Sequence, residues 1–303
     1  PDYATLRSEI EALMARDRAH IAAGRYRAPE PEPGGVIGSA RRAMDFLGDA
    51  RAVARRRAEG ANCEVLEPSL QERYPRYYLQ NFHYQSDGWL SRDSARRYDT
   101  QVETLFGGGA AAMRRQALPP LREALAARQG GARGAAVMDL ACGAGGFLRE
   151  VMANFPAIRA HGVDLSPDYL AEAADRLAPW SRRVSLRQAA AESLPFADGE
   201  MDAVTCIYLF HELPKKIRPI VAAEIARILR PGGTFIFIDS ILRGEAPELD
   251  GLLDLFPIQF HEPYYSEFVA SDPDALFQAA GLRRTSLDRA FLSRVAVFEK
   301  PLG

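Results

Sequence analysis

The sequence predicts an α/β protein in which a mostly parallel sheet carries helices on both faces and follows an N-terminal helical region. A short apolar run from Ala136 to Asp139 leads into closely spaced glycines and then into an apolar helix pattern. A second apolar run ends in Asp164, and short apolar runs continue to alternate with helical patterns as far as Glu299. Strands that alternate with helices form parallel sheets with right-handed crossovers.

Composition and charge exclude several classes of protein. The 303 residues are 47% hydrophobic and 26% charged, which is typical of a soluble globular chain. Because the net charge is −2, we expect neither nucleic acid nor a membrane as a partner. Cys63, Cys142 and Cys206 are far apart and form no Cys-x-x-Cys pair, which favours a reducing compartment. With no run of about 18 apolar residues and no signal-peptide pattern, we expect a cytoplasmic protein.

Residues 1–134 are expected to form a mostly helical cap that contributes to substrate binding, followed by a second domain over residues 135–303. Apolar residues recur at helical spacing in three stretches, and glycine-rich breaks separate them. The expected helices span residues 1–28, 36–59 and 110–128, the last interrupted at Pro119 and Pro120, and Gly130 to Gly134 form the linker to the sheet. The large helical region makes a homodimer plausible.

Residues 74–98 differ from a simple core helix. Seven aromatic residues and His83 stand among Asn, Gln, Ser and Asp, with no clean period of 2 or 3.6. Such mixtures line pockets, because aromatic rings supply area and polar groups fix orientation. An irregular segment that packs its aromatic rings against the main domain explains the same pattern equally well. We nominate His83, Tyr84 and Trp89 as substrate-binding residues.

The glycines after the first strand suggest a ligand site. A glycine has no Cβ, so Gly143 and Gly145 can adopt positive φ and let a ligand approach the main chain. Free N–H groups at the start of the following helix suit a carboxylate or a phosphate. A dinucleotide fingerprint would need glycine or alanine where Leu148 stands, and a P-loop would need Gly-Lys-Ser/Thr after the turn. The sequence therefore matches neither the dinucleotide fingerprint nor the P-loop.

The details of this stretch indicate a family. Asp139 lies four residues before Gly143, and the order Val-Met-Asp-Leu-Ala-Cys-Gly-Ala-Gly-Gly resembles motif I of the class I methyltransferases that use S-adenosylmethionine. Asp164 follows 21 residues after Gly143, where a carboxylate can accept both ribose hydroxyls. The resemblance covers residues 136–299 and implies a Rossmann-like, seven-stranded sheet that ends in an antiparallel pair. It also implies S-adenosylmethionine as cofactor and S-adenosylhomocysteine as product.

The remaining elements follow in the order that this resemblance implies. Ser166 can cap the second helix, and Pro167 suits its first turn. The further expected helices span residues 167–179, 217–229 and 272–280, and the further strands span residues 184–188, 202–208, 234–239, 283–288 and 293–299. Residues 240–270 form an aromatic, insertion-like stretch after the fifth strand, which we expect on the substrate side.

The resemblance assigns a cofactor site residue by residue. Ala190 stands where the family places an acid that receives the adenine amino group, so Gln188 or Glu192 would have to replace it. Leu165 would pack on the adenine, and Tyr98 would close over the methionine end. The expected cofactor-binding residues are Tyr98, Asp139, Ala141, Gly143, Gly145, Asp164, Leu165, Ala191, Glu192 and Ile207.

Catalysis is assigned to the carboxyl end of the fourth strand, because ligands of open α/β sheets bind outside those ends. His211 is the expected base, although a histidine that only hydrogen-bonds a loop fits the same position. Glu212 would orient His211 or bind an amine, and His261 with Glu262 is the reserve pair. The expected substrate-binding residues are His83, Tyr84, Trp89, Tyr208, His261, Tyr264 and Tyr265.

We expect no metal, because Lys215 stands where a His-Glu-x-x-His zinc helix needs its second histidine. The leading hypothesis is methyl transfer to O, N, S or C of a small molecule by in-line displacement. The alternative is a cofactor-binding regulatory or partner protein without turnover. Methylation of a protein or RNA would predict an open basic groove instead of an aromatic pocket. A nucleic-acid amino group is disfavoured as acceptor, because the Asn/Asp-Pro-Pro-Tyr/Phe motif is missing after the fourth strand.

Overall fold

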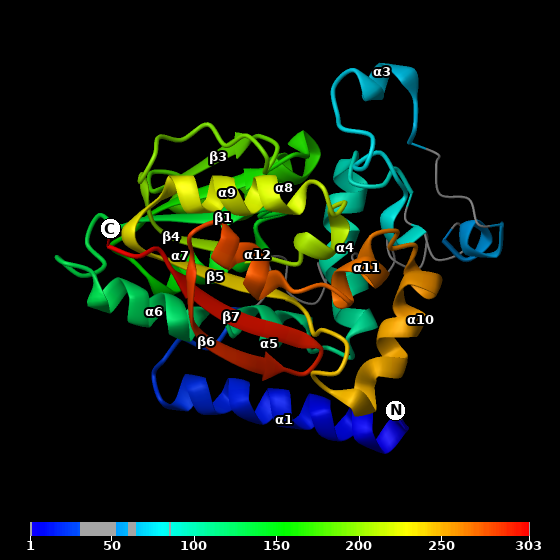
Figure 1. The fold of residues 1–303 in the computed structure, drawn as a ribbon, viewed down its shortest axis with the longest axis horizontal. Coiled ribbons are helices and arrows are strands. Elements are labelled where there is room, and N and C mark those ends of the chain that lie inside the picture. Colours follow the sequence, from blue (N-terminus) through cyan, green and yellow to red (C-terminus); the bar gives the residue numbers. More distant parts are fainter. Residues whose placement is uncertain (1, 31–52, 60–64, 85, 303) are drawn as a thin grey trace.

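A computed structural model of the protein describes residues 2–30, 53–59, 65–84 and 86–302 (Figure 1). At its centre lies a seven-stranded sheet in the order β3-β2-β1-β4-β5-β7-β6. All neighbouring pairs from β3 to β5 are parallel, whereas β7 runs antiparallel to β5 and β6. The strands are β1 (Ala136–Leu140), β2 (Arg159–Asp164), β3 (Val184–Gln188), β4 (Met201–Ile207), β5 (Leu229–Ser240), β6 (Arg283–Ala290) and β7 (Ser293–Glu299). The predicted fold class is confirmed.

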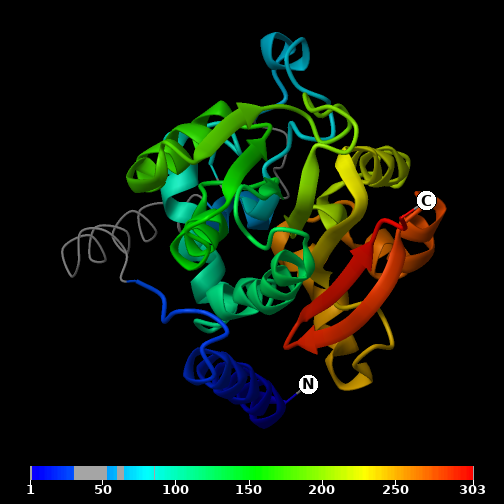
Figure 2. The same cartoon turned by 90° about the vertical axis from the view of Figure 1, so that its left-hand side faces the viewer.

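Helices cover both faces of this sheet (Figures 1 and 2). The N-terminal helices are α1 (Tyr3–Ala22), α3 (Pro68–Gln71), η1 (Phe82–Tyr84), α4 (Arg92–Leu105), α5 (Ala110–Arg115) and α6 (Leu118–Ala127). Those between and after the strands are α7 (Gly146–Asn154), α8 (Pro167–Arg176), η2 (Ala178–Trp180), η3 (Phe210–Glu212), α9 (Arg218–Ile228), η4 (Pro247–Leu249), α10 (Asp250–Phe260), α11 (Tyr265–Val269) and α12 (Pro273–Ala279). Residues 53–59 are also helical, and the rest of the helix expected over residues 36–59 lies outside the described residues.

The alternation of side chains along each strand separates two buried layers. On one face, Met138 of β1 and Phe237 of β5 belong to a cluster with residues of α9 to α12. On the other face, Val137 of β1 and Ile236 of β5 belong to a cluster with residues of α1 and α5 to α8. The N-terminal helices therefore share one apolar cluster with the sheet across the expected domain boundary at residue 134.

Helix α1 runs beneath the fold on the side of β6 (Figure 1), and a buried ion pair fixes it there. Asp17 of α1 accepts two hydrogen bonds from the Arg115 guanidinium of α5, at 2.9 and 2.7 Å, and one from the Tyr26 hydroxyl at 2.6 Å. The side chains of Asp17 and Arg115 are 8% and 7% exposed. A fully hydrogen-bonded charge pair of this kind tolerates burial, but losing one partner leaves the other charge uncompensated.

Local structure differs from the predictions in three places. The helix expected over residues 110–128 breaks at Gln116 and Ala117, and Pro119 lies in the first turn of α6, where its missing N–H needs no acceptor. Helix α4 begins at Arg92, within the segment expected to be irregular, because the Ser91 side chain caps the N–H of Ser94. The insertion after β5 folds into η4, α10 and α11.

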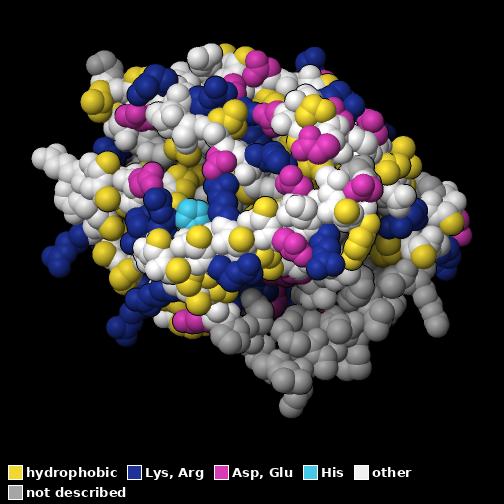
Figure 3. Space-filling model, turned by 90° about the horizontal axis from the view of Figure 1, so that it is seen from below, with side chains coloured by type: hydrophobic (Ala, Val, Ile, Leu, Met, Phe, Trp, Pro, Cys, Tyr) yellow, Lys and Arg dark blue, Asp and Glu magenta, His cyan; other side chains and the backbone are white. Residues whose placement is uncertain are grey.

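Figure 3 shows basic and acidic side chains intermixed on the face that it draws, so this face does not carry charge of a single sign. In the described part of the chain, we find no helix with both the length and the hydropathy that spanning a bilayer requires.

We expect Asp17→Asn to lower the free energy of unfolding by about 3 kcal/mol, because the buried Arg115 would keep only the more distant carboxylate of Glu150, 3.9 Å away, as a counter-charge. Chemical denaturation of the full chain measures this. Glu11→Gln in the same helix is the matched control: Glu11 is 63% exposed and pairs with Arg7 on the surface, so its removal should cost less than about 0.5 kcal/mol. Equal effects of the two substitutions would contradict the proposed anchoring of α1.

Candidate functional site

A cavity opens at the carboxyl ends of β1, β2 and β4, where the order of the strands reverses. Such a crevice is the usual ligand site of open α/β sheets. We call it the first cavity. Its lining includes all of the residues expected to bind the cofactor except Gly145, namely Tyr98, Asp139, Ala141, Gly143, Asp164, Leu165, Ala191, Glu192 and Ile207.

The glycine loop is tied to the end of β2 by Asp164. One carboxylate oxygen of Asp164 accepts the N–H of Gly143 at 2.8 Å, and the other accepts the N–H of Ser166 at 2.9 Å. Gly143 has φ of 53° and faces the cavity, where an added Cβ would meet no atom closer than 3.9 Å. The main chain is thus open to a ligand at this point.

Gly145 lies behind the glycine loop, away from the cavity that the other expected cofactor-binding residues line. It has φ of 77° and precedes α7, and an added Cβ would lie 3.1 Å from the Cβ of Ala173 on α8. This glycine lets α7 and α8 pack closely behind the loop. It does not line either of the cavities described here.

Two residues other than glycine adopt positive φ at the first cavity, Ala141 after β1 (59°) and Tyr208 after β4 (59°). Such backbone conformations are strained and are found preferentially at functional sites. Both strand ends therefore bend sharply at the place where a ligand would bind.

Asp139 is an unusual buried carboxylate at the floor of this cavity. It is 3% exposed, and one of its oxygens accepts a hydrogen bond of 2.7 Å from the Thr205 hydroxyl of β4. Burial raises the pKa of Asp139 to about 7, and the bond from Thr205 opposes that shift. A cationic ligand would stabilise its ionised form.

The position expected to receive the adenine edge is occupied by Ala191 and Glu192, which both line the first cavity. Glu192 accepts a short hydrogen bond from the Tyr77 hydroxyl, which is contributed by the N-terminal region. Gln188 donates instead to the carbonyl of Leu165 at 3.0 Å. Of the two residues suggested to replace the missing acid at Ala190, Glu192 is therefore the one that lines the cavity.

Aromatic side chains from the N-terminal region cover this cavity. The rings of Trp89 and Tyr98 meet edge to face at 5.3 Å, and Trp89 meets Tyr169 of α8 at 5.6 Å. Trp89, expected at the substrate, lines the first cavity.

A second cavity adjoins the first and is mainly apolar. Its apolar wall comes from α4, α10 and the turn before β7, and consists of Val102, Phe106, Leu252, Leu253, Phe256 and Leu292. Its polar lining includes His83, His211, Glu212, Ser240, Tyr265 and Ser293. Tyr98, Tyr208 and Glu212 line both cavities, so the two spaces share a wall.

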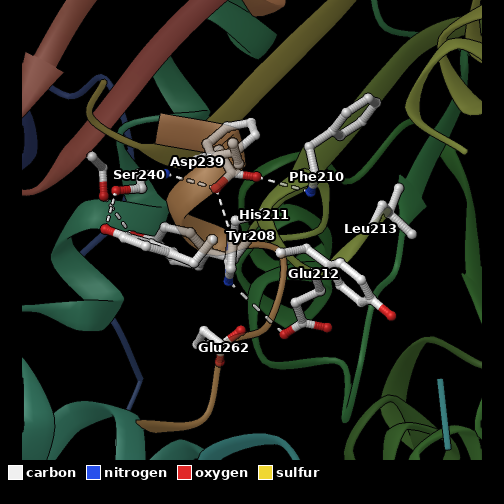
Figure 4. Close-up of polar contacts among 12 residues, drawn as sticks. Tyr208, Phe210, His211, Glu212, Leu213, Asp239, Ser240 and Glu262 are labelled. Atoms are coloured by element: carbon white, nitrogen blue, oxygen red, sulfur yellow. Dashed lines mark hydrogen bonds and ion pairs between the residues drawn. The ribbon is translucent and has the colours of Figure 1, made fainter. Parts of the chain in front are cut away.

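His211 lies in this second cavity and is held by Asp239 of β5 (Figure 4). Its Nδ1 is 2.6 Å from one Asp239 oxygen, which also accepts the N–H of Ser240 at 2.7 Å. The other Asp239 oxygen accepts the N–H of Phe210 at 2.9 Å. Asp239 is fully buried, so its three contacts fix the imidazole orientation and leave Nε2 on the side of Glu212, 4.0 Å away.

The charges around His211 determine its protonation. Burial alone would lower the pKa of His211, but Asp239, with Glu262 and Glu212, raises it to about 9. The imidazolium form is therefore favoured at neutral pH. Burial, followed by the nearby charge of Glu262, raises the pKa of Glu212 well above its ordinary value, and His211 opposes this shift.

Three residues expected at the substrate lie outside both cavities. His261 contacts the Gln80 side-chain oxygen through Nε2 at 3.0 Å, and the Tyr264 hydroxyl accepts a hydrogen bond from the Gln80 amide at 3.2 Å. The ring of Tyr84 packs 5.5 Å from that of His261. These side chains join the N-terminal segment to the insertion. Of the other residues expected to bind the substrate, His83, Tyr208 and Tyr265 line the second cavity.

Sequence reasoning missed Asp239 and Arg114. The position of Asp239 carried a signal, since it stands near the carboxyl end of the strand beside β4 and hence beside His211. Arg114 lines the first cavity from α5, where its Nη1 is 3.5 Å from Asp99. No pattern in the sequence distinguishes Arg114 from the neighbouring arginine.

Comparison with known proteins finds a family match over part of the chain. Residues 137–233 match the family described as "Methyltransferase domain". The ubiquinone/menaquinone biosynthesis C-methyltransferase UbiE of Syntrophotalea carbinolica is 32% identical over 34% of this chain and 43% of its own length. UbiE of Methylobacterium nodulans is 27% identical over 67% of this chain and 78% of its own length. The ubiquinone biosynthesis O-methyltransferase of Methylococcus capsulatus is 35% identical over 40% of this chain and 50% of its own length. The first and third matches span about half of the relative's length.

We expect Asp139→Asn to stabilise the protein at alkaline pH. Because the pKa of Asp139 rises from 3.8 to about 7 on folding, its contribution to stability is full below about pH 3.8 and is lost as the pH rises through 7. Asparagine does not ionise, so above pH 7 the variant should gain up to roughly 1.4 kcal/mol for each unit of the shift.

Denaturant unfolding of both proteins at about pH 5 and about pH 8 measures this difference. Asp93→Asn, at a side chain that is 73% exposed, is the control. A stability difference between Asp139→Asn and the natural protein that does not grow with pH would contradict the assignment.

Proposed function

We propose that the chain is a class I methyltransferase that uses S-adenosylmethionine and that it methylates a small, partly apolar molecule held in the second cavity. The bound cofactor supplies an electrophilic methyl group on a sulfonium. The observation on which this proposal rests is that Tyr98, Tyr208 and Glu212 line both cavities. A donor in the first cavity and an acceptor in the second would thus meet at one wall.

The residues of the first cavity fit this cofactor. Asp164 offers a carboxylate to the ribose hydroxyls, and the open main chain at Gly143 offers close approach. Asp139 places a buried carboxyl group near the loop, and a ligand that carries positive charge would stabilise its ionised form. Glu192 and the backbone of Ala191 are available to the adenine.

The second cavity supports a partly apolar acceptor with a polar nucleophilic group, which we leave as O, N, S or C. Its aliphatic and aromatic wall would exclude water, while His211 and Glu212 would orient the reacting atom. Holding two reactants in line can supply about 7–11 kcal/mol of the barrier. The names of the relatives above, which concern ubiquinone and menaquinone biosynthesis, agree with an acceptor of this kind.

His211 is proposed as the residue that positions the nucleophile. Because its pKa is raised to about 9, it can receive the proton of the nucleophile only in the neutral form that alkaline pH favours. Asp239 holds Nδ1, so Nε2 is the atom available to the second cavity. The same pair is expected in a protein that binds the cofactor without turnover, so activity must decide between the two functions. Incubation with methyl-labelled S-adenosylmethionine and a panel of phenols, amines, thiols and carboxylates tests transfer directly.

We expect Asp164→Ala to weaken S-adenosylmethionine binding about 10- to 100-fold, because hydrogen bonds to a charged group contribute about 1.5–3 kcal/mol. Calorimetric titration measures this. Asp168→Asn, four residues further along in α8 and outside both cavities, should bind as the natural protein does. Undiminished binding by Asp164→Ala would refute the proposed cofactor site.

We expect His211→Asn and Asp239→Asn to lower kcat by about 10²- to 10⁴-fold, with the cofactor Kd unchanged, because the proton-handling group is lost or misoriented. Steady-state kinetics with the acceptor identified in the panel, together with cofactor titration, measures both quantities. His161→Asn is the matched control, since His161 contacts Ser185 on β3 and lies outside both cavities. Unchanged kcat in His211→Asn would leave that histidine a purely structural role.

A further inference from the structure

Three side chains of metal-ligand type converge beside the second cavity, which two of them, His83 and Glu212, line. His83 comes from η1, Glu212 from η3 and Glu262 from the turn after α10. One potential ligand atom of each lies within 4.8 Å of the others. Because the three residues come from distant segments of the chain, no spacing rule applied to the sequence could detect them.

Glu262 is the residue that most needs a partner. It is 2% exposed, and among the described residues neither of its carboxylate oxygens accepts a hydrogen bond. The His83 Nε2 lies 3.0 Å from Oε1 of Glu262, but the two groups are not aligned as a hydrogen bond. Carboxylates are buried in this way when a cation completes their surroundings.

Glu212 brings a second carboxylate to the same space. Its side chain is 18% exposed and lies 4.0 Å from the Nε2 of His211. His211 cannot serve both carboxylates fully, because its Nδ1 is already engaged by Asp239. Figure 4 shows the carboxylates of Glu212 and Glu262 on the same side of the His211 ring. Two acidic groups therefore face a space that is short of positive charge.

We propose that His83, Glu212 and Glu262 bind one divalent transition-metal ion. A set of one imidazole and two carboxylates suits Mn²⁺, Fe²⁺ or Zn²⁺, whereas Mg²⁺ prefers a set made entirely of oxygen. Three protein ligands leave at least one position open for a ligand from solution. The apolar surroundings fit such a site as well, since His83 packs against the rings of Phe256 and Phe260 at 6.4 and 6.2 Å.

The metal site goes beyond the proposed function and is independent of it. Because His83 and Glu212 both line the second cavity, the ion would face the space assigned to the methyl acceptor. An oxygen of that acceptor could occupy the open position. Binding of the ion needs neither cofactor nor acceptor, so failure of methyl transfer and failure of metal binding can be told apart.

The test is metal binding by the full chain after treatment with EDTA and dialysis. Mn²⁺ is titrated and followed by electron paramagnetic resonance, and Zn²⁺ by calorimetry. We expect one ion per chain with a Kd in the micromolar range. Glu262→Gln and Glu212→Gln should each weaken binding by about 10-fold or more, since each removes one anionic ligand.

Glu267→Gln on α11 is the matched control, because Glu267 is 46% exposed, pairs with Lys215 and lies five residues from Glu262. It should bind the ion as the natural protein does. Thermal unfolding with EDTA present checks that the variants fold, and His83→Gln supplies a third test that keeps both carboxylates. The proposal is overturned if the natural protein binds neither ion at about 1 mM, or if all three ligand variants bind as tightly as the control.

Discussion

The reversal of strand order between β1 and β4 is the constraint on which the site depends. The chain lays β1, β2 and β3 outward in one direction and then crosses to the opposite side of β1 to begin β4. The helices that follow β1 and β4 consequently cover opposite faces of the sheet and leave a crevice between them. Asp139 and Asp164 reach this crevice from β1 and β2, whereas Asp239 of β5 is fully buried behind His211 and holds its imidazole.

Features that depend on local backbone geometry could be predicted from the sequence. Glycine allows the main chain to turn close to a ligand, so Gly143 and the acid before it indicated where the first cavity lies. Parallel strands align their carboxyl ends, so the order of the strands along the chain is enough to place Asp164 and His211 at one edge. The antiparallel β6–β7 pair followed from the family resemblance.

Features that depend on long-range contacts could not be predicted. The grouping of His83 with Glu212 and Glu262 requires η1, η3 and the turn after α10 to meet, and none of these segments has a regular period. Similarly, the start of α4 could not be predicted from the aromatic residues around Trp89. Tertiary packing, and not helical periodicity, determines which of them are buried. Glycine marked a main chain open to the cavity at Gly143 but not at Gly145, where close packing against α8 requires it.

Two adjacent arginines on α5 connect the first helix of the N-terminal region to the wall of the site. Arg115 points back to Asp17 on α1, while Arg114 points forward to Asp99 beside the cavity wall. The anchor of the first helix and the wall of the site thus share one turn of α5. Replacement of the region before β1 would therefore exchange a wall of both cavities together with its anchor, while β1 to β7 would keep the edge at which the first cavity opens.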